Sequence, residues 1–154
     1  MLAFFTCSSA SEVSACPQPD ERSEGAASLV AARRTATFPV RYPCFLPAGE
    51  ALSTATISGQ PGRQQVELIF NGPYEMAVRQ SQFPPVVDPD PTGSSRLLTD
   101  LFPNVPATFI QQNDGSRRAL YHLFWEQDGI FYELQAAGPP IQQRQILQIA
   151  RSLE

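Results

Sequence analysis

Apolar and polar residues alternate on both sides of an Asn-Gly-Pro sequence at residues 71–73. Alternation with a period of two is typical of a strand that buries one face. A short turn at this sequence would bring the apolar residues of both segments onto the same face and leave the charged residues on the other. The pattern therefore predicts a half-buried β-hairpin. Its predicted cross-strand pairs are Phe70 with Tyr74, Leu68 with Met76, and Val66 with Val78.

A second alternating pattern surrounds the Asp-Gly sequence at residues 128–129. A two-residue turn of this kind requires positive φ, which Gly adopts freely and Asp tolerates. The predicted pairs are Gln127 with Ile130, Trp125 with Tyr132, Leu123 with Leu134, and Tyr121 with Ala136. The other face holds His122, Glu126, Glu133 and Gln135, together with Phe124 and Phe131. We therefore expect Trp125, the only Trp of the chain, to be buried between neighbouring strands.

Apolar residues recur at helical spacing near both ends of the folded part. In the Ala-rich segment 26–36 they are Leu29, Ala32 and Ala36, and after the two prolines at 139–140 they are Ile146, Ile149, Ala150 and Leu153, supported by Leu147. Each segment predicts one helix. Between them, segment 38–49 contains three prolines, which exclude a helix and a central strand. We expect this segment to run extended along the core.

Segment 83–104 is long and rich in Pro and lacks a clear alternating pattern. We predict a loop with a short helical turn at residues 96–102, begun by Ser95 as the N-cap. Loops of this length inside a domain are often functional, so the segment is a candidate binding element; the alternative is a plain surface crossover. Asp88 and Asp90 could ligate Ca²⁺ weakly, but the segment lacks the ligand run of a calcium loop, so we expect a solvated turn.

Together these elements predict a single α+β domain over residues 25–154. Its sheet is expected to be curved and antiparallel, with about five or six strands, and with an N-terminal and a C-terminal helix packed on one face. A chain of 154 residues suits one such core. Residues 1–24 are rich in Ser, Glu and Pro without periodicity and predict a flexible arm.

The composition narrows the choice of function classes. The net charge of −4 offers no surface for phosphates, so we expect no nucleic-acid partner. No apolar run approaches the ~20 residues of a membrane-spanning helix. We find no Gly-rich phosphate loop and no Ser elbow, and one His is too few for most mixed metal sites. The expectation is a protein without cofactor, metal or catalytic residues.

The three cysteines suggest two modifications. An apolar start followed by Cys7 and small polar residues is what the remnant of a lipoprotein signal would leave, with membrane association through a lipidated Cys7; the alternative is a short arm with an incidental Cys. In an oxidising compartment Cys16 and Cys44 would form a disulfide; the alternative is three free thiols.

Several of these motifs resemble a bacterial extracytoplasmic domain of unknown function. They are Phe38-Pro39-Val40 to Leu46-Pro47-Ala48-Gly49, the hairpin from Trp125 to Tyr132, and the ending from Ile149 to Leu153. That family occurs in anti-sigma-factor-like proteins, sporulation proteins and small lipoproteins, and it is similar to lipoprotein-carrier and sigma-regulatory sensor folds. The resemblance covers residues 25–153 except 83–104. It implies a curved antiparallel sheet with helices on one side, and a location outside the cytoplasmic membrane.

The expected function is a non-enzymatic exported binding or sensing module that contacts a protein or a component of the cell envelope. We expect it in the periplasm or at the cell surface, and leave a cytoplasmic location and the oligomeric state open. The alternative is a carrier of an apolar, lipid-like ligand in the concavity of the sheet. A more distant alternative is a hydrolase-type enzyme that uses His122 with Glu126 or Glu133 as an acid–base pair. The predicted binding patch comprises Phe124, Phe131, Leu97, Leu98 and Phe102; the alternative is that the N-terminal helix covers Phe124 and Phe131.

Overall fold

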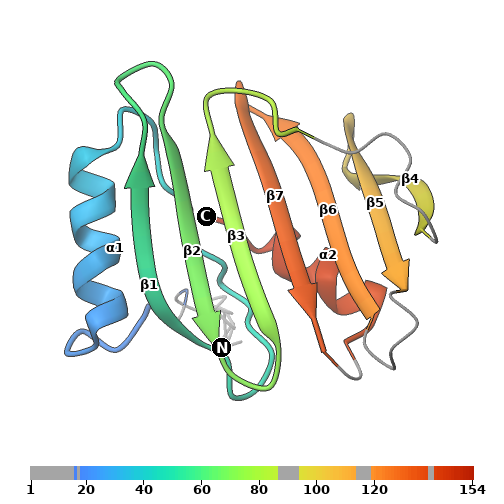
Figure 1. Cartoon of the computed structure of the whole chain (residues 1–154), viewed down its shortest axis with the longest axis horizontal. Coiled ribbons are helices and arrows are strands. Elements are labelled where there is room, and N and C mark those ends of the chain that lie inside the picture. Colours follow the sequence, from blue (N-terminus) through green and yellow to red (C-terminus); the bar gives the residue numbers. More distant parts are fainter. Residues whose placement is uncertain (1–15, 17, 87–93, 114–118, 139–140) are drawn as a thin grey trace, which may run out of the picture.

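A computed structural model describes residues 16, 18–86, 94–113, 119–138 and 141–154 (Figure 1). The described elements are α1 (Glu24–Thr35), β1 (Ala51–Ser58), β2 (Gln65–Asn71), β3 (Glu75–Ser81), β4 (Ser94–Phe102), β5 (Val105–Asn113), β6 (Ala119–Gln127), β7 (Ile130–Ala137) and α2 (Gln143–Arg151). All strand pairs are antiparallel, in the order β1-β2-β3-β7-β6-β5-β4. The predicted α+β class with one antiparallel sheet is confirmed, but in the described part the sheet has seven strands instead of five or six.

The unpredicted strand is β4, which occupies the residues predicted to form a helical turn. It pairs with β5 from Ser94 opposite Gln112 to Phe102 opposite Val105. The prediction of a turn at 96–102 is wrong because β5 offers a strand partner along nearly the whole segment, and such pairing overrides the ambiguous local pattern. Asn104, with φ of 65°, supplies the positive φ of the tight turn that joins the two strands.

The last hairpin has the predicted register. Gln127 lies opposite Ile130, and Trp125 lies opposite Tyr132. Asp128 and Gly129 have φ values of 55° and 74°, as an Asp-Gly turn of this type requires. The Trp125 side chain is buried, at 5% exposed. Turn chemistry and apolar alternation therefore determined this hairpin together.

The first hairpin has the predicted faces but not the predicted register. Phe70 lies opposite Met76 rather than Tyr74, so each predicted pair is shifted by two residues. The backbone N–H of Tyr74 donates to Oε1 of Glu50 at 2.7 Å, which takes Tyr74 out of the strand ladder and lengthens the loop. Because the shift is two residues, the same side chains still point to the core. The buried set includes Val66, Leu68, Phe70, Met76 and Val78.

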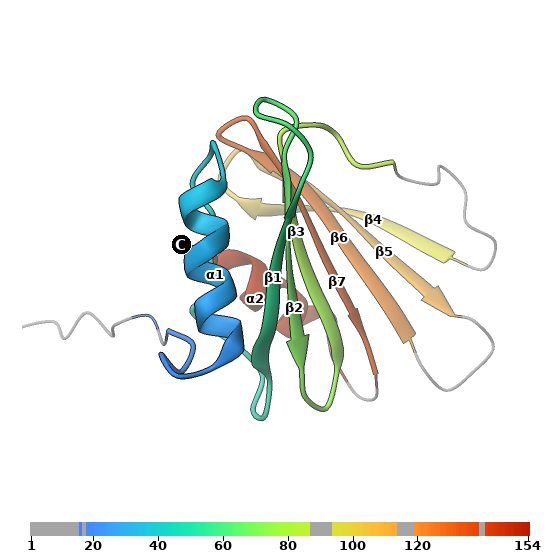
Figure 2. The same cartoon turned by 60° about the vertical axis from the view of Figure 1, so that its left-hand side comes forward.

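The two helices lie on one side of the sheet (Figure 2). Helix α1 approaches β1 closely at Gly25, where a Cβ atom would overlap the backbone carbonyl of Leu52. Helix α2 buries Ile146, Ile149 and Ala150. Leu68, Val78, Leu134 and Leu123 lie in one cross-strand row and are fully buried. Neither described helix is long and apolar enough to cross a bilayer.

In the extended segment between α1 and β1, residues 37–41 are held by side-chain amides. Oε1 of buried Gln64 accepts the backbone N–H of Thr37 at 2.7 Å, and buried Gln80 bonds both backbone groups of Arg41. Farther along, the backbones of Tyr42 and Glu154 exchange hydrogen bonds in both directions. These contacts position residues 42–47, which form one wall of the site described next.

Candidate ligand-binding site

The five residues of the predicted binding patch do not form one surface. Leu97 and Leu98 are neighbours in β4, and adjacent residues of a strand point to opposite faces. By register, Leu98 shares the face opposite the helices with Phe124 and Phe131, and it is 75% exposed. Leu97 is on the helix side and 48% exposed, and Phe102 packs against the core. The predicted patch is therefore divided between the two faces of the sheet, with Leu98, Phe124 and Phe131 on one of them.

A row of charged side chains crosses the face opposite the helices. Arg79 on β3 donates to Glu67 on β2 at 2.7 Å and to Glu133 on β7 at 2.9 Å. Nδ1 of His122 on β6 lies 3.0 Å from Oε1 of the same Glu133. The His122 ring stacks on Phe124, with centroids 5.8 Å apart and planes within 3°. Of the two carboxylates expected as partners of His122, the structure therefore brings Glu133 to the ring.

The electrostatics of this row favour a structural role. Burial raises the pKa of Glu133, but hydrogen bonds from His122 and Arg79 and their charges outweigh it, so the pKa is lowered. Burial likewise lowers the pKa of Arg79, yet its hydrogen bonds and charge interactions with Glu133 and Glu67 leave it raised. A His–carboxylate pair has the composition of a general base. Here the Glu133 carboxylate also binds Arg79, and the His122 ring stacks on Phe124. These contacts hold neighbouring strands together.

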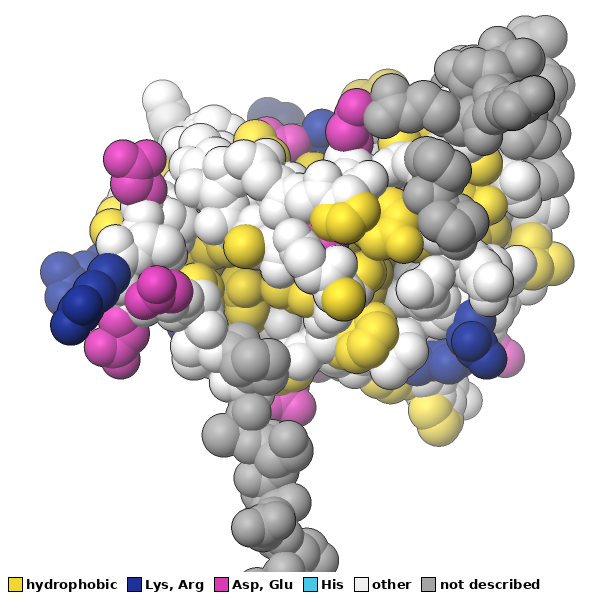
Figure 3. Space-filling view, turned by 90° about the horizontal axis from the view of Figure 1, so that it is seen from below, with side chains coloured by type: hydrophobic (Ala, Val, Ile, Leu, Met, Phe, Trp, Pro, Cys, Tyr) yellow, Lys and Arg dark blue, Asp and Glu magenta, His cyan; other side chains and the backbone are white. Residues whose placement is uncertain are grey.

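A hollow of about 370 Å³ lies where the N-terminal arm meets the extended segment. Its apolar walls comprise Pro19, Tyr42, Phe45, Leu46, Pro47 and Leu52; we call it the arm pocket. Apolar side chains gather in a hollow at this end of the molecule (Figure 3). Burial raises the pKa of the Tyr42 phenol, opposed by the positive charge of Arg33, so the phenol stays a neutral hydrogen-bonding group at neutral pH.

Glu50 is the buried polar residue of the arm pocket. Its side chain is 9% exposed, and its Oε1 accepts the N–H of Tyr74. Its Oε2 is buried and has no hydrogen-bond partner. A buried polar atom without a partner costs free energy, about 1–3 kcal/mol for a neutral group and more for a charged one. Such an atom, in a residue that lines a largely apolar hollow, indicates a group that water or a ligand completes.

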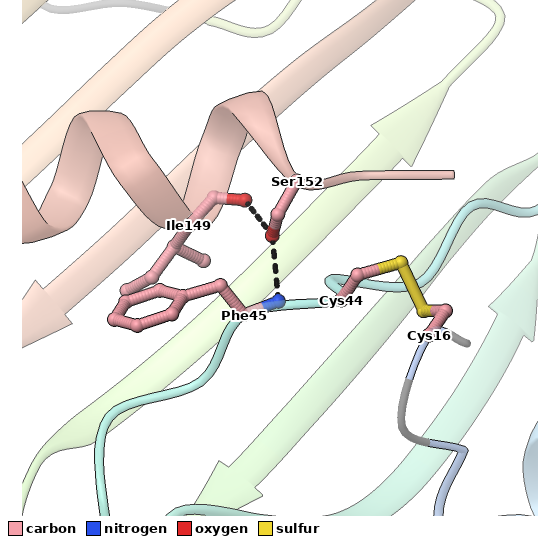
Figure 4. Close-up of a disulfide and its surroundings, with 5 residues drawn as sticks. All are labelled: Cys16, Cys44, Phe45, Ile149 and Ser152. Atoms are coloured by element: carbon pink, nitrogen blue, oxygen red, sulfur yellow. Dashed lines mark hydrogen bonds between the residues drawn. A yellow bond between two sulfur atoms is a disulfide. The ribbon is translucent and has the colours of Figure 1, made fainter. Parts of the chain in front are cut away.

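The disulfide between Cys16 and Cys44 fastens the arm against this pocket (Figure 4). Next to it, the Ser152 hydroxyl donates to the carbonyl of Ile149 at 2.7 Å and accepts the N–H of Phe45 at 2.9 Å (Figure 4). The wall therefore joins three segments that are distant in the sequence. Of the two alternatives for these cysteines, the structure contains the disulfide. Cys7 lies outside the described residues, as do Asp88 and Asp90.

The arm separates the arm pocket from a second hollow, of about 510 Å³, against α1. Gln18 and Pro19 line both hollows. A ligand atom of Glu154 lies within 4.8 Å of the sulfurs of Cys16 and Cys44, which is close enough for a shared metal ion. Metals bind thiolates, however, and these two sulfurs are joined to each other. We therefore assign no metal to this cluster.

Glu50 is the residue that the sequence analysis missed. It is a single acidic residue at the end of a Pro-rich segment, and such residues are usually solvated. The available signal is its position: it is the only charged residue between Tyr42 and Leu52, in an otherwise apolar stretch that begins a strand. Glu50 and Tyr74 are 24 residues apart, so the sequence around either residue does not predict their contact.

Comparison of the chain with family models, curated proteins and solved structures finds no match. The resemblance carried by the Trp125–Tyr132 hairpin and the terminal helix therefore stays a prediction. Function has to be inferred from the chemistry of the arm pocket and of the surfaces around it.

Proposed function

We propose that this chain is a non-enzymatic binding module that holds a small amphiphilic ligand in the arm pocket. The observation that carries the proposal is that Glu50, whose buried Oε2 has no hydrogen-bond partner, lines a pocket with largely apolar walls. A ligand with an apolar body would cover the apolar walls and exclude water from them. This burial contributes roughly 25 cal/mol of favourable free energy per Å² of apolar area. A hydrogen-bond-donating head, such as an amine or a hydroxyl, would complete the bonding of the carboxylate.

The volume of the pocket suits a small ligand. At about 370 Å³ it lies near the lower end of the range of roughly 300–1,000 Å³ that is common for small-molecule sites. The ligand site proposed from sequence in the concavity of the sheet is less favoured, because the helix side of the sheet is filled by fully buried residues such as Leu68 and Leu134. We place the ligand beside the arm instead.

The proposed location is outside the cytoplasmic membrane. The disulfide between Cys16 and Cys44 supports it, because disulfides persist mainly in oxidising compartments. A reducing compartment would release the arm, and with it the wall that Pro19 contributes to the pocket. In the oxidising compartment, a protein or envelope component would bind the ligand-bound form of the chain, and the chain would act as a sensing module.

The test is calorimetric titration of the purified chain with three matched probes: octylamine, octanol and octanoate. We expect the amine and the alcohol to bind and the carboxylate not to bind, because Glu50 repels it. Glu50→Gln should weaken the amine about tenfold or more, which corresponds to one lost charge-assisted hydrogen bond. Leu46→Ala should weaken both binding probes, because it removes apolar area from the wall.

The control is Glu126→Gln, which removes the same charge at an exposed position on β6. It should leave every affinity unchanged. The proposal is wrong if octanoate binds as well as octylamine, or if Glu50→Gln folds normally and binds the amine like the unmodified chain.

A further inference from the structure

Strand β4 is an edge of the sheet that the described residues leave open. It is the last strand in the order, whereas helix α1 lies along β1 at the other edge (Figure 1). An edge strand presents a row of backbone N–H and C=O groups that can pair with another chain. Proteins commonly protect such edges with Pro, with inward-pointing charges, with bulges or with a covering element.

Among the described residues, the contacts that protect β4 lie at its C-terminal end. A register shift lies between Asp100 and Phe102, and Arg151 of α2 donates to the carbonyls of Leu101 and Asp100 at 2.7 and 3.3 Å. Within the part of the chain that the structure describes, residues 96–99 have neither a register shift nor a covering side chain. Among the described residues, four large hydrophobic side chains are exposed, and two of them, Leu97 and Leu98, are neighbours here. An edge strand with exposed apolar side chains is typical of an interaction site.

We infer that β4 pairs antiparallel with β4 of a second copy of this chain, about a two-fold axis at Leu98. In this register Arg96 lies opposite the partner's Asp100, and Asp100 lies opposite the partner's Arg96. Arg96, Leu98 and Asp100 are exposed. They are alternate residues of the strand, so all three lie on the face opposite the helices. The two copies of Leu98 then meet between two ion pairs.

The charge pattern favours a second copy over an unrelated peptide, because it is self-complementary. A two-fold axis requires that the same surface serve both partners, and a strand with Arg and Asp placed symmetrically about Leu meets that requirement. Moving the axis by one residue, to Leu97, would set Arg96 against Leu98 and lose both ion pairs. The charges therefore select one register as well as one partner. With only two exposed leucines per copy, we expect a reversible dimer.

The test is sedimentation velocity on the full chain over a wide range of protein concentration. Every protein carries Cys7→Ser, so that a cross-link through this third thiol is not counted as a dimer, and no reductant is needed. We expect the parent chain to dimerise with rising concentration. Arg96→Asp and Asp100→Arg should each weaken the dimer at least tenfold, because each places like charges opposite one another twice.

The decisive variant combines Arg96→Asp with Asp100→Arg. It reverses both ion pairs, so it should dimerise like the parent chain. Arg144→Asp makes the same charge change as Arg96→Asp at an exposed position of α2, and it should have no effect. Leu98→Lys should give a monomer with an unchanged circular dichroism spectrum. A parent chain that stays monomeric at all concentrations would overturn the inference, and so would a folded double variant that does not regain the dimer.

Discussion

The side-chain amide of Gln80 bonds the backbone of Arg41 in both directions. The N–H of Arg41 donates to Oε1 of Gln80 at 2.9 Å, and Nε2 of Gln80 donates to the carbonyl of Arg41 at 2.7 Å. Gln80 is fully buried, and its side chain bonds both backbone groups of Arg41 in place of a strand partner at that residue. This contact anchors the segment whose continuation forms a wall of the arm pocket.

Gln80→Leu should destabilise the fold strongly. The substitution removes the partners of two partly buried backbone groups, and each such loss costs up to about 1–3 kcal/mol. We expect a loss of about 2–5 kcal/mol in the free energy of unfolding, measured with urea. The matched control is Gln135→Leu. Gln135 lies on β7 and points to the other face of the sheet, and the substitution should change stability by less than about 1 kcal/mol. Equal losses in the two variants would contradict the anchoring role.

Trp125→Ala should leave a poorly folded protein. The Trp125 ring stacks on Tyr132 with centroids 5.0 Å apart and planes within 8°. Truncating a buried aromatic costs about 3–5 kcal/mol, out of a typical total of about 5–15. Thermal melting followed by circular dichroism measures the effect. Phe124→Ala, half-buried on the other face of the same strand, should lower the melting temperature less. An unchanged melting temperature of Trp125→Ala would contradict the register.

Glu133 should contribute stability that depends on pH. Its pKa is lowered in the folded state, so its contribution is present above the ordinary value of 4.5 and is lost as the pH falls through the lowered value. The stability difference between the unmodified chain and Glu133→Gln should therefore be largest at neutral pH and shrink in acid. Urea unfolding at a series of pH values measures it. Glu126→Gln should show a small difference throughout, and a constant difference for Glu133→Gln would contradict the assigned shift.

Removing the disulfide should destabilise the domain and weaken the arm pocket together. The two cysteines are 28 residues apart, and closing a loop of this length in the unfolded chain is worth roughly 3–4 kcal/mol on the chain-entropy model. We expect Cys16→Ser with Cys44→Ser to lower the melting temperature and to weaken octylamine binding. A double variant that melts and binds like the unmodified chain would show that the arm needs no covalent anchor.

The last hairpin illustrates what can be predicted from sequence. The Asp128-Gly129 turn and the alternating residues around it are close in the chain, so their preferences act before any distant contact forms. The same reasoning assigned the correct faces to the first hairpin. It failed on the register there because Glu50 captures the N–H of Tyr74, and that contact requires the assembled fold.

The sequence by itself determined which residues alternate, which turns are tight and which side chains are apolar enough to form a core. These properties are local, since they depend on the backbone preferences and solvation of neighbouring residues. Only the tertiary structure decided that 94–102 is a strand, that Leu97 and Leu98 lie on opposite faces, and that Glu50 is buried beside an apolar hollow. Those outcomes depend on partners far away in the chain, because a strand needs a neighbour and a buried carboxylate needs surrounding walls.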